Sequence, residues 1–447
     1  MHIITNGAKN FLLIFLVGFS IYQTGELWLR DSLSHNFFYT LFAQSDTEPN
    51  NHKSSFVLPY RIITSIGNNR FNIKFSGVSE SPKRQLVDHA IASLLSGGEY
   101  VATHDGIDFS RFLSYRSIIY EYSFSMPTEP FVRVLGEGTS VLTHFEYFDS
   151  IVVVPSPSAS NLVYFIFMDT KNDRAYEYKL AQSSLHDILN REIQAAHRNL
   201  SIYQIDYISS KLMGLNFRTN IFLPRWRNQE YEHNMVNIIN NHYDTQPLLP
   251  VIGRNLYMFF ENPAAIWPNT RDNVFIYSDE NIVVQYFQNG VLEYINYRQG
   301  TVQGDLLSDF DVARRFLSRD TMVTNEFFLA GFTEQEDMRV FYFDYVINNF
   351  PIVFTERFRE DMGVPDLQHA IEITVQNGIV TRYRKIAYSF EMHSSATQII
   401  STDLITVVDD VSGKNIRNIN FGYNIFRRDS STVNNLMSLE WFVDLYS

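Results

Sequence analysis

The longest apolar stretch of the chain lies near its N-terminus. Residues 11–22 (FLLIFLVGFSIY) carry no charge, and after four residues (QTGE) the chain is apolar again at Leu27, Trp28 and Leu29. As a helix, the segment from Phe11 to Leu29 would be roughly 28 Å long, close to the thickness of the hydrocarbon core of a membrane. The pattern predicts a transmembrane helix over residues 9–30, with residues 1–8 as a cytoplasmic tail and the bulk of the chain outside the cytoplasm.

A cleaved signal peptide is the alternative for this segment, with residues 11–22 as its apolar region. Cleavage sites of the small-x-small type are poor here, because Leu41 stands two residues before Ala43. A retained, single-pass anchor in the cell membrane is therefore the favoured interpretation.

One face of the predicted helix carries small residues. Gly18 and Gly25 are seven residues apart and align within about 20°. Small residues let a second membrane helix approach closely, so this face is a candidate partner surface. The alternative is that the two glycines have no packing role, since glycine is common in membrane helices. The candidate face consists of Phe11, Ile14, Gly18, Tyr22 and Gly25.

Beyond a polar linker at 31–55, the first half of the chain alternates between strand and helix patterns. Leu86, Ala90 and Leu94 form a helical stripe that follows Pro82 and ends at Gly97, and a second helix is expected at 184–200. Period-two alternation predicts strands at 56–66, 70–76, 131–135, 139–143, 150–154, 161–168 and 174–180.

The second half contains an internal echo. The tripeptide Gln-Asn-Gly lies between apolar alternations in both 283–298 and 371–385, and each pattern predicts a hairpin with a tight Asn-Gly turn. A helix is expected after each hairpin, at 308–318 with Ser308 as its cap and at 402–411, and another is possible at 229–242. Strand pairs are expected at 326–333 with 338–348 and at 416–426 with 438–446.

These patterns predict an α+β fold: an N-terminal transmembrane helix followed by tandem domains of antiparallel sheets with helices packed on one face. We expect an N-terminal extracytoplasmic domain at 56–200, a middle domain at 201–310 and a C-terminal domain at 311–447. Aromatic residues make up 15% of the chain, which suits sheets because rings fill half-buried pleated surfaces.

Charge and cysteine content exclude several classes of function. The net charge is −13, and an acidic surface repels nucleic acid. The chain has no cysteine, so disulfides and thiolate chemistry are excluded. It also lacks the HExxH, Ser-x-x-Lys and G-x-S-x-G motifs of common hydrolases, and no cofactor motif is complete. We therefore predict no catalytic, metal or cofactor site and a protein that is not an enzyme.

Three weaker candidates for chemistry remain. His104 and Asp105 could form a catalytic pair, although a surface loop is favoured. The acidic tip Glu334, Glu336 and Asp337 could bind calcium weakly, with a solvated hairpin turn as the favoured alternative. His233 and His242 would point in opposite directions on a helix and could not share a metal.

Several segments resemble the YycH/YycI family, and the YycH branch more than the shorter YycI. They are the anchor that ends near Trp28, FYFDYVINNFPIVF (341–354), AIEITVQNGIVTRYRK (370–385), and the closing strands IRNINFGYNIF (416–426) and SLEWFVDLYS (438–447). In the closing strands, Gly422, Tyr423 and Trp441 match the family's Gly-Tyr pair and late Trp. Asn348-Asn349 departs from the family pattern, in which an Asn-Gly is expected.

The resemblance implies an accessory regulator of the WalK (YycG) sensor histidine kinase, which controls cell-wall metabolism in low-GC Gram-positive bacteria. It implies action through transmembrane helix contacts and a sister YycI/YycH-like protein as a second partner. The family has no catalytic residues to carry over, and only the predicted helix at 11–29 transfers as functional. The alternative function is an extracytoplasmic binding protein for a cell-wall polymer or lipid.

Overall fold

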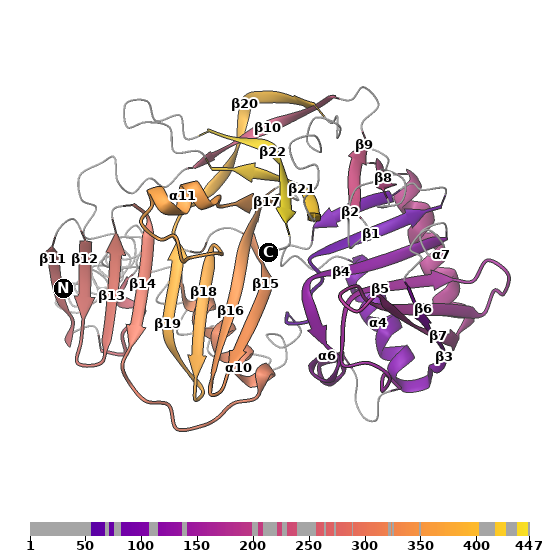
Figure 1. The fold of residues 1–447 in the computed structure, drawn as a ribbon, viewed down its shortest axis with the longest axis horizontal. Helices are drawn as coiled ribbons and strands as arrows, with labels where there is room; N and C mark the ends of the chain where they lie inside the picture. The colour runs from indigo at the N-terminus through magenta and orange to yellow at the C-terminus, as the bar shows by residue number, and fades with distance from the viewer. Residues whose placement is uncertain are drawn as a thin grey trace, which may run out of the picture. The chain divides into compact units, whose positions relative to one another are not determined.

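A computed structural model describes residues 55–445 of the chain, apart from gaps at 68–70, 76–81, 107–114, 136–140, 199–203, 209–220, 226–229, 239–255, 263–264, 272–273, 288, 321–322, 324–325, 348–349, 402–415 and 426–435. These residues form two sheets with a few helices, so the predicted α+β class is confirmed (Figure 1).

The first sheet has nine strands, and all neighbouring pairs in it are antiparallel. In spatial order they are β3 (Glu99–Asp105), β7 (Arg174–Ala181), β6 (Leu162–Asp169), β5 (Tyr147–Pro155), β4 (Arg116–Pro127), β1 (Arg61–Ile66), β2 (Phe71–Phe75), β8 (Gln204–Ile208) and β9 (Ile221–Arg225). Its helices are α4 (Pro82–Gly97), α6 (Thr128–Leu135) and α7 (Ser183–Arg198).

Local patterns explain most of this sheet. Helix α4 begins at Pro82 as predicted, and a Cβ at Gly98 would lie 2.7 Å from the carbonyl oxygen of Leu94, so only glycine fits directly after the helix. Helix α7 buries Leu185, Leu189 and Ile193 and contacts β1, β4, β5 and β6. The strands predicted at 150–154, 161–168 and 174–180 are confirmed as β5, β6 and β7.

The prediction of a strand at 131–135 was wrong. These residues belong to α6, which has Glu129 and Pro130 in its first turn and buries Phe131. Acidic residues and proline are typical of helix starts, and these local signals outweigh the strand preference of Phe131 and Val132.

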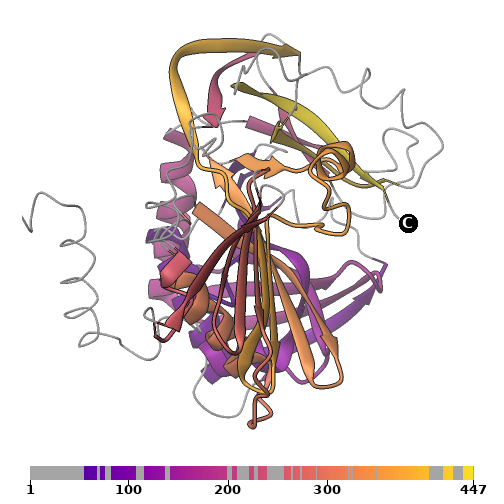
Figure 2. The same cartoon turned by 90° about the vertical axis from the view of Figure 1, so that its left-hand side faces the viewer.

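The second sheet has twelve strands on one path, with β15 added beside β16. In spatial order they are β11 (Trp267–Arg271), β12 (Val274–Ser278), β13 (Ile282–Phe287), β14 (Val291–Asn296), β19 (Ile379–Ile386), β18 (Ile371–Gln376), β16 (Met338–Ile347), β17 (Phe350–Val353), β21 (Ile416–Asn424), β22 (Leu436–Leu445), β10 (Glu230–Ile238) and β20 (Phe390–Ser401); β15 is Glu326–Gln335. Among the described strands of this sheet, β17 and β21 are the one pair that runs in parallel. Helix α10 (Leu306–Arg319) contacts β16, β18 and β19, and α11 is the short helix Glu356–Asp361 (Figure 2).

Both Gln-Asn-Gly hairpins are confirmed, but their turns differ. Asn377 and Gly378 both have positive φ (50° and 78°), as a two-residue turn between β18 and β19 requires. Between β13 and β14 the loop has three residues and ends at Gly290 (φ 91°), whose N–H donates to the carbonyl of Phe287. The same tripeptide therefore supports two loop lengths.

The repeated hairpin pattern predicted two separate sheets, but the two hairpins belong to one sheet. Strand β14 pairs with β19, so the two hairpins lie side by side in one sheet, and Tyr294 is opposite Tyr383. The pairs β15–β16 and β21–β22 are confirmed. The boundaries predicted for the domains at 56–200, 201–310 and 311–447 remain predictions.

Two helix predictions need correction. The possible helix at 229–242 is strand β10 over Glu230–Ile238, which pairs with β20 and β22. The cap of α10 is Asp305 and not Ser308: the Asp305 carboxylate accepts a hydrogen bond from the Ser308 backbone N–H at 2.8 Å. The helix predicted at 402–411 lies outside the described residues.

Candidate functional site

The candidate membrane face lies outside the described residues. Phe11, Ile14, Gly18, Tyr22 and Gly25 therefore remain a prediction. In the part of the chain that the structure describes, no helix is both long and apolar enough to cross a membrane.

The weaker candidates are engaged in ordinary contacts. His104 lies in edge strand β3 and not in a loop, and its Nε2 is 2.8 Å from Glu177 rather than beside Asp105. Glu334 of the acidic tip accepts from Arg339 Nε at 2.6 Å, and Asp337 accepts from Gln303. His233 belongs to β10, and His242 is not described. Among the described residues, no group of three or more His, Asp and Glu side chains could hold a metal ion.

A buried ion pair joins α10 to the second sheet. Lys385 Nζ lies 2.5 Å from the carboxylate of Asp320, and both side chains are 0% exposed. The hydroxyl of Tyr383 donates to the same carboxylate oxygen at 2.6 Å. Burial lowers the pKa of Lys385 while Asp320 opposes that shift, and burial together with Asp320 raises the pKa of Tyr383. With no exposed atom for a reactant to meet, this cluster is structural.

The arrangement with the most functional promise is the junction between the two sheets. We define the junction as the contacts of β4, α6 and residues 55–61 with α10, its cap Asp305, and β15. An aromatic cluster fills it: Phe56 packs against Phe124 of β4, Phe310 of α10 and Phe332 of β15, with ring centroids 6.2, 5.1 and 6.0 Å away. Phe124 and Phe332 also meet edge to face at 5.6 Å. Aromatic pairs at these distances stabilise beyond their buried area.

Two polar contacts between described residues cross the junction near the aromatic cluster. Arg133 of α6 donates to the carboxylate of Asp305 at 2.6 Å, and their side chains are 43% and 52% exposed. Ser123 Oγ donates to the carbonyl oxygen of Leu329 at 2.9 Å. Partial burial alone would raise the pKa of Asp305, but hydrogen bonds from Ser308 and Arg133 outweigh it and lower this pKa to about 2.

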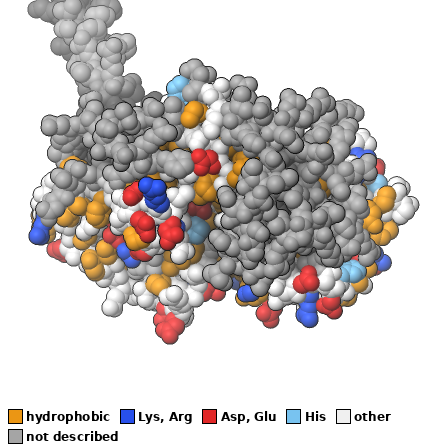
Figure 3. All heavy atoms as spheres, turned by 45° about the horizontal axis from the view of Figure 1, so that its top comes forward, with side chains coloured by type: hydrophobic (Ala, Val, Ile, Leu, Met, Phe, Trp, Pro, Cys, Tyr) orange, Lys and Arg blue, Asp and Glu red, His pale blue; other side chains and the backbone are white. Residues whose placement is uncertain are grey.

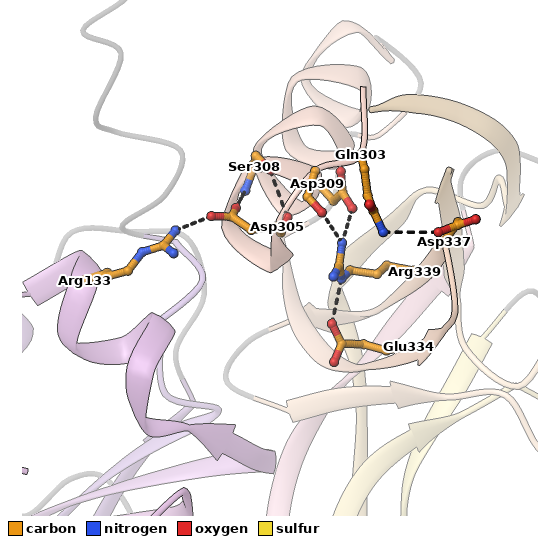
Figure 4. A network of polar contacts seen from close by, with 9 residues as sticks. Arg133, Gln303, Asp305, Ser308, Asp309, Glu334, Asp337 and Arg339 are labelled. Atoms are coloured by element: carbon orange, nitrogen blue, oxygen red, sulfur yellow. Dashed lines mark hydrogen bonds and ion pairs between the residues drawn. The ribbon is translucent and has the colours of Figure 1, made fainter. Parts of the chain in front are cut away.

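Asp305 also belongs to a network at the start of α10 (Figure 4). One turn along, the buried carboxylate of Asp309 accepts from Arg339 Nη1 at 2.5 Å. Burial raises the pKa of Asp309, and Arg339 opposes the rise. A Cβ at Gly304 would lie 2.1 Å from Asp309 Oδ1, so a larger residue there would displace the Asp309 carboxylate. The network fixes the α10 end of the junction against the hairpin of β15 and β16.

The sequence did not identify the junction. Phe56 was expected to begin a strand, but β1 begins at Arg61 and Phe56 lies before it. Its ring partners are between 68 and 276 positions away, from Phe124 to Phe332, and periodicity carries no information about such distant contacts.

The residues that carried the family resemblance have packing roles. A Cβ at Gly422 would lie 2.8 Å from Val353 and 2.9 Å from the carbonyl oxygen of Pro351, so glycine permits the close approach of β21 to β17. Tyr423 is fully buried, and its hydroxyl donates to the Asn234 carbonyl at 3.3 Å. Trp441 lies over the ring of Phe421, with centroids 3.8 Å apart.

Charges are mixed on the surface. On the face drawn in Figure 3, acidic side chains lie near basic ones. Two exposed ion pairs tie β3 to β7: Lys179 with Glu99 at 2.9 Å, and Arg174 with Asp105 at 3.2 Å. Exposed pairs of this kind contribute little to stability.

Comparisons with known proteins bear on the fold. No protein-family model matches the chain, and no curated protein matches it. Among solved structures, YycH from Bacillus subtilis is similar over 88% of this chain and 94% of its own, with a TM-score of 0.54 and 12% identity. An uncharacterised protein from Eubacterium rectale covers 54% of this chain and 84% of its own, with a TM-score of 0.34 and 11% identity. At such identity the likeness to YycH concerns the fold, and the resemblance predicted from the sequence is confirmed at that level: this chain has a YycH-like fold.

Proposed function

We propose that this protein is a non-enzymatic, membrane-anchored regulator of a sensor histidine kinase of the WalK type, with the bulk of its chain outside the cytoplasm. The observation that carries the proposal is the YycH-like fold, which extends over 88% of the chain. The apolar N-terminal segment supports it, because a regulator of a membrane kinase needs a route into the membrane. A sister protein of the same family is the second expected partner.

The proposed mechanism is helix coupling. A membrane helix packed against the helices of the kinase can shift them between two arrangements only through its different affinity for each, typically by about 1–3 kcal/mol. Small residues such as Gly18 and Gly25 allow the close packing on which that difference depends. The extracytoplasmic sheets would then orient the helix or receive the signal.

Co-purification of the full-length protein from membranes tests this proposal. Wild type should recover a histidine kinase, and Gly18→Leu with Gly25→Leu should lose it. Ser20→Leu is the matched control, because residue 20 lies about 200° around the helix from residue 18 and adds similar bulk on the other side. Absence of any kinase with wild type, or its retention after both glycine substitutions, would count against helix coupling.

A second candidate is a binding protein for a cell-wall polymer or lipid. It is favoured by Trp267 at the start of β11 and Tyr297 just after β14, which are 66% and 68% exposed, since exposed aromatic rings often mark binding surfaces. This function predicts that cell-wall fragments bind to the protein and that Trp267→Ala weakens this binding. It also predicts that exchanging residues 11–29 for an unrelated membrane helix leaves signalling unchanged.

A further inference from the structure

The first described segment of the chain, residues 55–61, lies in the junction. It follows residues 1–54, which lie outside the described part of the chain and include the predicted membrane helix. It precedes β1 and contains no regular helix or strand before Arg61. Phe56 and Val57 are nevertheless buried, so the segment is held by tertiary contacts and not by a backbone ladder.

Contacts with the first sheet hold one side of this segment. The hydroxyl of Tyr122 donates to the Val57 carbonyl at 3.2 Å. At the end of the segment, Arg61 is buried and its Nη2 donates to Glu121 at 3.0 Å. Both partners belong to β4.

Contacts with the second sheet hold the other side. The ring of Phe56 meets Phe310 and Phe332, and Tyr60 packs against Phe328 of β15 with centroids 4.8 Å apart. Neither sheet alone provides the complete seat, because the partners of Phe56 come from β4, α10 and β15.

We infer that residues 55–61 are a strap that closes the junction, so that seating of the strap and closure of the two sheets are one coupled event. If the strap leaves, the aromatic cluster loses a ring that contacts both sides. If the sheets separate, Phe56 loses half of its seat. A displacement transmitted along the chain from residues 1–54 would therefore act on the junction, and a change at the junction would act on the chain that leads to the anchor. That second step rests on the proposed function; the coupling itself does not.

The absence of cysteine from the chain makes a direct test possible. A Cβ built at Gly331 of β15 lies 3.8 Å from Cβ of Phe124 in β4, a typical separation for a disulfide. The backbone at Gly331 is not in the left-handed region, so cysteine fits there. The double variant Phe124→Cys with Gly331→Cys therefore places a reducible lock across the junction.

Hydrogen exchange of the purified full-length double variant, oxidised and reduced, is the measurement. With the lock closed, the backbone amides of residues 56–58 and 60 should exchange at least about tenfold more slowly, because a disulfide restricts opening; Pro59 has no amide hydrogen. Phe124→Cys alone, with and without reductant, controls for the lost ring. If the disulfide forms and exchange at 56–60 is unchanged, the strap does not report on the junction and the inference is overturned.

The converse experiment needs no cysteine. Phe56→Leu should speed exchange in β15 and in residues 122–126 of β4 relative to wild type. Phe165→Leu is the matched control, because Phe165 is equally buried but lies in β6, within the first sheet. Equal exchange at the junction in the two variants would also overturn the inference.

These readouts require no kinase, so they separate the strap from the proposed function. Kinase output in cells that carry the oxidised lock is measured independently. Unchanged output together with altered exchange would count against the proposed function and leave the strap standing.

Discussion

The two ends of helix α10 carry ion pairs of nearly the same length and very different character. At its N-terminus, Asp305 meets Arg133 at 2.6 Å across the junction. At its C-terminus, Asp320 meets Lys385 at 2.5 Å inside the second sheet. The first pair is about half exposed and the second is fully buried. Distance therefore does not decide what each pair contributes; burial does, because water competes for the first and is excluded from the second.

This difference assigns the two ends of α10 distinct roles. The C-terminal end is fixed to β19, and separating it would leave a charge in an apolar core. The N-terminal end is held to α6 by a contact that water can replace. Opening of the junction would break the exposed pair and leave the buried pair of the second sheet intact, which is the condition that a reversible strap requires.

Breaking the buried pair should have the largest effect. Lys385→Met removes the cation beside the buried Asp320 carboxylate, which still accepts a hydrogen bond from the Tyr383 hydroxyl. We expect a loss of about 3–5 kcal/mol in the free energy of unfolding, measured by chemical denaturation. Adding Asp320→Asn should recover most of the loss, because the amide oxygen still accepts from Tyr383 and no charge remains. A loss below about 1 kcal/mol would mean that the buried pair contributes no more to stability than an exposed ion pair does.

Two glycines allow the same comparison between a tightly packed site and the junction to be made for the backbone. Gly422→Ala puts a methyl group under 3.0 Å from Val353 and from the Pro351 carbonyl, so β17 and β21 must shift. We expect a destabilisation of about 1–3 kcal/mol. Gly331→Ala at the junction meets only Phe124 and Tyr342, at 3.8 and 3.9 Å, and should change stability by less than about 1 kcal/mol. Thermal unfolding of both variants checks this, and equal shifts would contradict the contrast.

How far the sequence predicts this molecule depends on the range of the contacts. Helices α4, α7 and α10 and both Gln-Asn-Gly hairpins were predictable, because their signals lie within a few residues of one another. Glu129 and Pro130 are also local signals for a helix start, but the sequence prediction gave more weight to the β-prone residues that follow them.

Long-range pairing was not predictable. Strand β10 lies between β22 and β20, and both of these partners come more than 150 residues later in the chain. The sequence of β10 itself fits a helix as well as a strand. The strap is a similar case: the pattern marks Phe56 as apolar, but only the fold brings Phe124, Phe310 and Phe332 to it.

A half-buried arginine with no counter-charge among the described residues sharpens the comparison on the same helix. Arg314 lies over the ring of Phe327 at 4.9 Å, and its Nε is buried with no hydrogen-bond partner among the described residues. Burial lowers the pKa of Arg314 to about 10. Arg314→Met keeps the packing stem and removes the desolvated group, so we expect a gain of about 1 kcal/mol. The neighbouring Arg315→Met, which breaks a partly exposed pair with Asp311, should change stability by less than about 1 kcal/mol in the same assay.

The exposed pair at the junction should give the smallest effect. Arg133→Met should lower stability by less than about 1 kcal/mol at neutral pH. Asp305→Asn should do the same, because asparagine still caps α10 and only the ion pair is lost.

The pH dependence identifies the source of that small effect. The folded-state pKa of Asp305 is about 2, below the ordinary value of 3.8, so its contribution is present above pH 3.8 and is lost as the pH falls towards 2. The difference between wild type and Arg133→Met should therefore shrink over this range, as measured by denaturation at a series of pH values. A difference that persists unchanged at pH 2 would mean that Arg133 acts through packing and not through charge.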